Sequence, residues 1–499
     1  MRPIEAVLSA ANVLAFFSLI LPLPAAIQGF RLAAPAALLI AVVQMIAEGA
    51  RWQMFPAYLL AGMLFLIWLT SRLTPEGLSV SRWVAGAGVG LGILGLLVSV
   101  ALPLVLPVFR FPQPSGPYAI GTLSYHWTGT GRPELFTSNP DDQRELMAQV
   151  WYPAGDTSGL PPAPYIMDAD AVAPALARLT RLPAFLFTHF RYVTTHAAVS
   201  APIADDQPLY PVLIFLSGLG GFRQVNTFQI EELVSYGYIV VGLDQPGAVA
   251  LVQFPDGRQV AGLKRDELHP LVVQSVEPQP DTTTLFGEPL PEGIVPYFAA
   301  DVSFALDQLE MLNNADPNGI LTGRLDLEQA GIFGISLGGI NAAEACLRDG
   351  RLKACLIMDV YMSSSVVAEG LQQPAMWITR DAETMRFERE RAGGWLEHEI
   401  LLHQRTMRAV YESLPGDGYY LQIPDMFHLN LTDFPYWSPL WPQIGLTGPV
   451  SGQRIFEIVN AYSVAFFDQH LRGQPAALLT GPSPQYPEVN FESRHQPQP

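Results

Sequence analysis

One stretch near the middle of the chain constrains its fold more than any other. Residues 331–339 read Gly-Ile-Phe-Gly-Ile-Ser-Leu-Gly-Gly, and an alanine-rich helical pattern follows directly. An apolar strand that ends in Gly-x-Ser-x-Gly and turns into a helix is the setting of a nucleophile elbow, in which glycines leave room around a strained serine. The pattern predicts a strand–turn–helix and marks Ser336 as a candidate nucleophile. The alternative is a glycine-rich turn with an incidental serine.

The first 110 residues contain only nine charged side chains, and four long uncharged runs lie between them. Because about 20 apolar residues span a bilayer as a helix, we predict membrane helices near residues 6–27, 32–48, 53–71 and 83–108. A cleavable signal peptide is the alternative for the first run, but the other runs would still hold the protein in a membrane. We expect an integral protein of the cell membrane. Arginines flank the runs equally on both sides, so the side of the membrane that the rest of the chain faces stays undetermined.

The remainder of the chain is strongly acidic. Residues 1–110 carry a net charge of +3, which leaves −21 on the rest of a chain whose total is −18. Such a surface repels nucleic acid, so we expect neutral or zwitterionic substrates and no nucleic-acid partner. The two cysteines, Cys346 and Cys355, provide neither a disulfide framework nor a metal cluster and are expected to be buried thiols. We expect no metal and no cofactor.

From residue 111 onward, short apolar runs alternate with helical patterns. This alternation is typical of an α/β fold with a mostly parallel sheet covered on both faces. Strands are predicted at 147–153, 211–217, 238–244, 330–335, 353–359, 374–379 and 419–423, and helices at 226–236, 298–313, 337–348, 383–413 and 452–471. We therefore expect a transmembrane module over 1–110 and a catalytic domain over 111–480. Within it we expect a lid-like excursion at 245–296 and a helical segment near the site entrance at 160–205, and after it a flexible tail at 481–499.

A serine nucleophile needs an imidazole to take its proton and a carboxylate to hold that imidazole. Of nine histidines, His428 alone follows a predicted strand and precedes the final helix, so it is the candidate base; the other eight are interpreted as solvated or structural. Two aspartates end predicted strands, Asp359 and Asp381. The usual place of the acid in this architecture favours Asp381, although its neighbour Arg380 suggests a solvated salt bridge instead.

The oxyanion formed during acyl transfer needs backbone N–H donors that already point at it. The residue after the nucleophile, Leu337, supplies one of them. The other is expected from the glycine-rich loop at 217–221, which directly follows an early predicted strand.

Four motifs in this order resemble the platelet-activating-factor acetylhydrolase family. Phe215-Leu-Ser-Gly-Leu-Gly-Gly-Phe-Arg223 is similar to its oxyanion loop, Gly334–Gly339 to its elbow, Ile357-Met-Asp-Val-Tyr361 to its acid strand, and His428-Leu-Asn-Leu-Thr-Asp-Phe434 to its histidine loop. The resemblance covers about 115–470 and implies an α/β-hydrolase fold. It also implies Asp359, rather than Asp381, as the acid, and the N–H groups of Leu219 and Leu337 as the oxyanion hole. The chain departs from the family in lacking the loop histidine and in carrying the membrane module.

We therefore expect a membrane-anchored serine carboxylic-ester hydrolase that cleaves short or oxidised acyl chains from phospholipids or related lipid esters. One alternative keeps this chemistry but takes small or polyester-like esters, as in dienelactone-hydrolase-like enzymes. A second alternative is a non-catalytic membrane receptor or scaffold built on a hydrolase fold. That alternative predicts the loss of catalytic side chains, and all of them are present.

Overall fold

The computed structural model describes residues 1–499 except 23, 75–80, 138, 140, 181 and 496–499. The chain forms two compact units. The smaller unit comprises residues 1–109 together with two short later segments, 188–192 and 437–440, and the larger unit comprises the rest. The smaller unit is thus built mainly, but not only, from the N-terminal part of the chain.

Within the described residues, four helices are long and apolar enough to cross a membrane. They are α1 (Pro3–Ile20), α2 (Ala33–Gln44, flanked by η1 Ala25–Leu32 and η2 Met45–Gly49), α3 (Phe55–Leu73, preceded by η3 Trp52–Met54) and α4 (Arg82–Val105). The first helix ends at Ile20 rather than near residue 27, because Pro22 follows and the residue before a proline disfavours helix.

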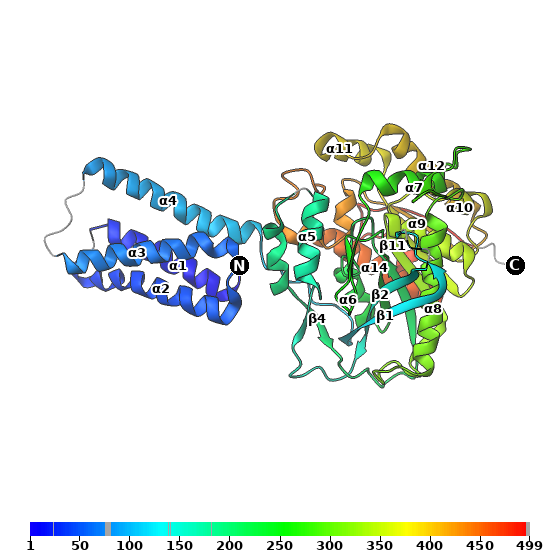
Figure 1. The fold of residues 1–499 in the computed structure, drawn as a ribbon, viewed down its shortest axis with the longest axis horizontal. Coiled ribbons are helices and arrows are strands. Elements are labelled where there is room, and N and C mark those ends of the chain that lie inside the picture. Colours follow the sequence, from blue (N-terminus) through cyan, green and yellow to red (C-terminus); the bar gives the residue numbers. More distant parts are fainter. Residues whose placement is uncertain (23, 75–80, 138, 140, 181, 496–499) are drawn as a thin grey trace. The chain divides into compact units, whose positions relative to one another are not determined.

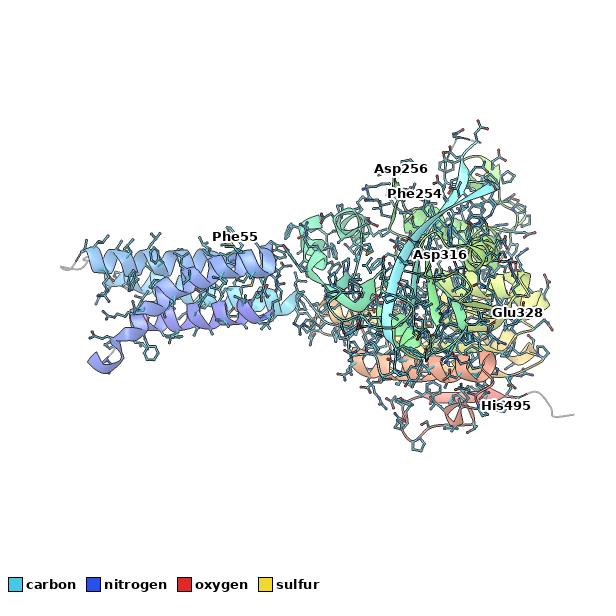
Figure 2. All side chains as sticks on the ribbon, turned by 90° about the horizontal axis from the view of Figure 1, so that it is seen from below. Phe55, Phe254, Asp256, Asp316, Glu328 and His495 are labelled. Carbon is cyan, nitrogen blue, oxygen red and sulfur yellow. The ribbon has the colours of Figure 1, made fainter. Side chains whose placement is uncertain are left out.

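Small residues let these helices approach one another. Ala37 and Ala57 are fully buried in the bundle, and a Cβ on Gly92 would lie 2.1 Å from the ring of Phe16. Large apolar side chains such as Phe55 project outward and are exposed (Figure 2). At one end of the bundle, Glu5 pairs with Arg51 at 2.7 Å. The outward apolar surface and the inward small residues are the arrangement that membrane helices share.

The larger unit is built on one large sheet. In the described part of the chain its eleven strands follow the order β15-β14-β13-β12-β11-β5-β6-β2-β1-β4-β3. The central strands are parallel: β6 (Ile239–Asp244), β5 (Tyr210–Leu216), β11 (Leu325–Ile335), β12 (Leu352–Met358), β13 (Ala375–Thr379) and β14 (Gly418–Gln422). Antiparallel pairing joins β2 (Gln143–Ala154) to β6 and to β1 (Ala119–Pro133), and β4 (Thr194–Val199) and β3 (Pro162–Pro164) lie at that edge.

Helices cover both faces of this sheet (Figure 1). Ile332 of β11 packs into the main core with residues of α8 (Val295–Asn314) and α9 (Leu337–Arg348), whereas the next residue, Phe333, contacts Phe467 of α14 (Gly452–Leu471). Because successive strand residues point to opposite faces, these contacts place α8 and α9 on one face and α14, with α6 (Thr227–Ser235), on the other. The expected α/β fold with a mostly parallel sheet is confirmed.

The two irregular segments have structure of their own. Residues 245–296 contain the hairpins β7–β8 (Leu251–Gln253 and Gln259–Ala261) and β9–β10 (Thr284–Leu285 and Glu288–Pro289) on either side of α7 (Arg265–Val276). Phe254 and Asp256 mark the first hairpin in Figure 2. Residues 160–205 hold α5 (Ala169–Thr180) and the 3-10 helix η4 (Ala184–Tyr192), but also strands β3 and β4, so that segment is only partly helical.

Two further expectations need correction. The helix expected over 383–413 is two helices, α11 (Ala382–Ala392) and α12 (Glu397–Ser413), because Gly393 and Gly394 adopt positive φ angles between them. The expected loose tail contains β15 (Asn490–Arg494), which pairs antiparallel with β14, and His495 follows it (Figure 2). The remaining short helices are α10 (Ser364–Glu369), η5 (His428–Leu431), α13 (Phe434–Trp437) and η6 (Ala477–Leu479).

Candidate active site

Ser336 occupies a strained turn between β11 and α9. Its φ of 56° and ψ of −126° lie in a region that residues with a side chain rarely adopt. The neighbouring glycines are sterically required, since a Cβ on Gly334 would lie 2.3 Å from the Gly338 carbonyl oxygen and one on Gly338 would lie 2.1 Å from the Leu216 carbonyl oxygen. The elbow therefore holds Ser336 at the edge of the sheet that is formed by the carboxyl ends of the parallel strands.

Asp359 and His428 meet beside this turn. Asp359 follows β12, which is hydrogen-bonded to β11, and His428 begins η5 after β14. Asp359 Oδ2 lies 2.5 Å from His428 Nδ1, so the carboxylate accepts the Nδ1–H and leaves Nε2 available as a proton acceptor. The Asp359 side chain is fully buried, and that of His428 is 19% exposed. Ser336 and His428 both line the same pocket.

Asp359 is held by three further side chains. Thr379 Oγ1 and Arg380 Nε each donate to Oδ1 at 3.0 Å, and His403 Nε2 lies 3.4 Å from the same oxygen. Burial alone would raise the pKa of Asp359. The Arg380 guanidinium, together with His403 and His428, instead holds that pKa well below its usual range. The carboxylate is therefore charged whenever the protein is folded near neutral pH.

The pocket has a volume of about 360 Å³ and is largely apolar. Leu219 and Leu337 line it beside Ser336, together with Ile340, Val360, Tyr361, Val272, Trp395, Leu429 and Leu446. Its charged or titratable lining residues, apart from His428 and Tyr361, are Arg265, His269 and Glu388. Walls of this kind accept an apolar acyl or aryl group next to the serine.

The oxyanion loop approaches the elbow closely. A Cβ on Gly218 would lie 3.0 Å from the Cβ of Ser336. Leu337 is the first residue of α9, so its N–H has no acceptor within the helix. The loop is held by Arg223, whose N–H donates to Asp244 Oδ1 at 2.7 Å and whose guanidinium pairs with the same carboxylate. The N–H groups of Leu219 and Leu337 remain the predicted oxyanion donors.

Asp381 has a different role. Its side chain accepts the N–H of Thr384 at 2.7 Å and so caps the N-terminus of α11. The salt bridge suggested between Asp381 and a solvated Arg380 is wrong, because the Arg380 side chain is fully buried and pairs with Asp359 and Glu388.

Several residues at the site were not found from the sequence. His403 of α12, read as solvated or structural, is fully buried against Asp359, and burial lowers its pKa, so the ring is neutral. Glu388 and Trp395 lie on or near α11, which sequence periodicity merged with α12. The Gly393-Gly394 pair was the one local signal for this break. Both cysteines are buried and free, as expected.

Comparison with known proteins points to one class of enzyme. Residues 106–256 match the family model described as platelet-activating factor acetylhydrolase, isoform II. The chain is 24% identical over 428 residues to a probable 1-alkyl-2-acetylglycerophosphocholine esterase of Arthroderma benhamiae, covering 80% of this chain and 98% of that protein. It is 19% identical over 385 residues to the platelet-activating factor acetylhydrolase of Gallus gallus, covering 73% of this chain and 84% of that protein.

A solved structure agrees with this class. The ferulic acid esterase of Streptomyces cinnamoneus superposes with a TM-score of 0.59 and 27% identity, covering 77% of this chain and 99% of that one. The resemblance carried by the four sequence motifs is thus confirmed by family model, relatives and fold. The chain is a carboxylic ester hydrolase with an α/β-hydrolase fold, similar to the platelet-activating-factor acetylhydrolases.

Proposed function

We propose that Ser336, His428 and Asp359 are the nucleophile, base and acid of this esterase. The observation that carries the proposal is the 2.5 Å contact between Asp359 and His428, on the wall of the pocket into which the strained Ser336 turn opens. His428 Nε2 takes the proton as Ser336 Oγ attacks the ester carbonyl, and then gives it to the leaving alcohol. Water activated by the same imidazole hydrolyses the acyl-enzyme.

The backbone N–H groups of Leu219 and Leu337 stabilise the oxyanion of each tetrahedral intermediate. The close approach of Gly218 to Ser336 supports this assignment, because it brings the loop within reach of the developing charge. Asp359 keeps His428 in the correct tautomer and stabilises the imidazolium that forms. Asp381, as a helix cap, takes no part.

We further propose that the substrates are lipid esters with short or oxidised acyl chains, hydrolysed at a membrane in which α1–α4 anchor the enzyme. Four apolar helices with exposed large side chains support the anchor. The names of the Arthroderma benhamiae and Gallus gallus relatives support an acetylated glycerophospholipid substrate. The pocket volume supports a small acyl group at the serine.

A second candidate substrate class is soluble esters, either aromatic or other small carboxylic esters. The specific observation in its favour is the ferulic acid esterase, which shares both fold and 27% identity with this chain. A vesicle assay separates the two candidates. Detergent-purified protein reconstituted into phosphatidylcholine vesicles should release acetate from an acetylated glycerophosphocholine faster than ferulate from methyl ferulate, and the opposite ranking favours the second candidate.

The nucleophile is tested separately from the substrate. Ser336→Ala should lower hydrolysis of a soluble nitrophenyl ester by at least ~10³-fold. A fluorophosphonate probe should label the wild type at Ser336 and leave the variant unlabelled. Labelling of another serine, or unchanged turnover in Ser336→Ala, would show that the assignment is wrong.

A further inference from the structure

Arg380 carries a fully buried positive charge near the candidate active site. It follows β13 directly, and its side chain is fully buried. A buried guanidinium is costly unless acceptors satisfy it. The acceptors that satisfy Arg380 therefore indicate which groups it holds in place.

The first partner is the acid. Arg380 Nε donates to Asp359 Oδ1 at 3.0 Å, and Arg380 Nη2 lies 2.8 Å from Oδ2. This two-point contact fixes the plane of the carboxylate as well as its position. Oδ2, which faces His428 Nδ1, cannot rotate away without breaking both contacts.

The second partner is Glu388 of α11. Arg380 Nη1 pairs with Glu388 Oε2. The other carboxylate oxygen, Oε1, accepts the backbone N–H of His428 at 3.3 Å. His428 is therefore contacted on its ring by one carboxylate and on its backbone by the other, and Arg380 joins the two carboxylates.

We propose that Arg380 and Glu388 are positioning residues that hold His428 from both ends and, through their opposite charges, set the pH below which the enzyme loses activity. The proposal rests on His428 being the base of the proposed function. Neither residue touches the reacting atoms; both act through Asp359 and His428. Glu388 also lines the pocket, so the same pair connects the substrate-binding wall to the acid.

The charges around His428 define the expected direction of the effect. Asp359 faces it from the end of β12, Arg380 from the end of β13 and Glu388 from α11. Neutral His403 approaches Asp359 from α12, and Trp395 packs edge-on against the His403 and His428 rings. Arg265 and His269 of α7 line the same pocket. Removing the positive charge of Arg380 favours the imidazolium, whereas removing the negative charge of Glu388 disfavours it.

The test is the pH profile of kcat/KM for a soluble nitrophenyl ester, measured with the full chain in detergent. Glu388→Gln keeps the shape and the acceptor for the His428 N–H but removes the charge. Its acidic limb should move to lower pH by roughly 0.5 unit. Arg380→Gln should move the limb to higher pH, and Arg380→Lys, which keeps the charge but not the two-point contact, should lower kcat without that shift. Glu390→Gln, an exposed carboxylate on the same helix, is the matched control and should behave as wild type.

Opposite shifts of the acidic limb in Glu388→Gln and Arg380→Gln would identify the positioning role. A purely structural role would lower activity without shifting the limb. An unmoved acidic limb in folded Glu388→Gln overturns the proposal, even if Arg380→Gln does not fold. Fluorophosphonate labelling of Ser336 in every variant keeps this outcome separate from the proposed function. Labelling at Ser336 without the opposite shifts refutes only the positioning role, whereas labelling elsewhere refutes the catalytic assignment itself.

Discussion

At the scale of single residues, Asp359 is a buried carboxylate that accepts hydrogen bonds from several side chains. Thr379, Arg380 and His428 all donate to it, and the side chain has no exposure to solvent. Such a carboxylate remains charged and fixed in orientation near neutral pH. Its positive φ of 52° is a second sign that the local structure holds it in a particular place.

Asp359→Asn should therefore lower kcat on the order of 10⁴-fold, because an amide at this position favours the wrong His428 tautomer. Asp381→Asn should be mild, since asparagine also caps a helix. Steady-state hydrolysis of a soluble ester by both variants checks the ranking. A severe loss in Asp381→Asn with a mild one in Asp359→Asn would return the acid role to Asp381.

At the scale of elements, α9, the helix that follows Ser336, is also held at its far end. Asp349 follows α9 and accepts both the N–H and the guanidinium of Arg351. Partial burial alone would raise the pKa of Asp349, but the Arg351 hydrogen bonds lower it to about 2. A carboxyl whose folded pKa is depressed stabilises the fold above its unfolded pKa of about 3.9 and loses that contribution as the pH falls through 2.

Asp349→Asn should accordingly lower the thermal unfolding temperature at about pH 7, but hardly at about pH 2. The side chain of its partner Arg351 is 40% exposed, so solvent screens the pair and the loss should be only about 0.5–1 kcal/mol. Glu328→Gln, an exposed carboxylate on β11 (Figure 2), serves as the control and should change neither value. Equal destabilisation of Asp349→Asn at both pH values would argue for lost packing rather than lost charge.

At the scale of the whole molecule, the residues of the candidate site lie in the larger unit, as does every residue that lines the pocket. Deleting residues 1–111, so that the chain starts near Pro112, should therefore preserve hydrolysis of soluble short-chain esters. Activity on lipid presented in vesicles should fall, because an anchor raises local substrate concentration rather than contributing chemistry.

Circular dichroism is the necessary control for this truncation. Segments 188–192 and 437–440 belong to the compact unit of the helices, so their surroundings change when the helices are removed. A truncated domain that is folded but inert on soluble esters would show that the helices complete the active site.

The sequence alone indicated the α/β fold and four apolar helices, because both depend on local patterns. The strands around Ser336 are apolar runs bounded by turns, and Gly334 and Gly338 mark the elbow. Asp359 was preferred through family resemblance rather than spacing, since Asp381 also ends a strand. Strand β15 was missed because a short polar segment at a sheet edge has no apolar run to mark it.

Tertiary structure alone decided which charged groups lie around His428. Arg380 follows β13, and His403 and Glu388 lie on α12 and α11. From the sequence, Arg380 was interpreted as solvated and His403 as solvated or structural, and no pattern singled out Glu388. They meet at Asp359 and His428 because parallel strands bring their carboxyl ends to one edge, and because α11 breaks at Gly393 beside the pocket. Local pattern determines which segments form strands and helices, whereas the partners of a buried charge depend on which segments pack together. Sequence spacing does not record that packing.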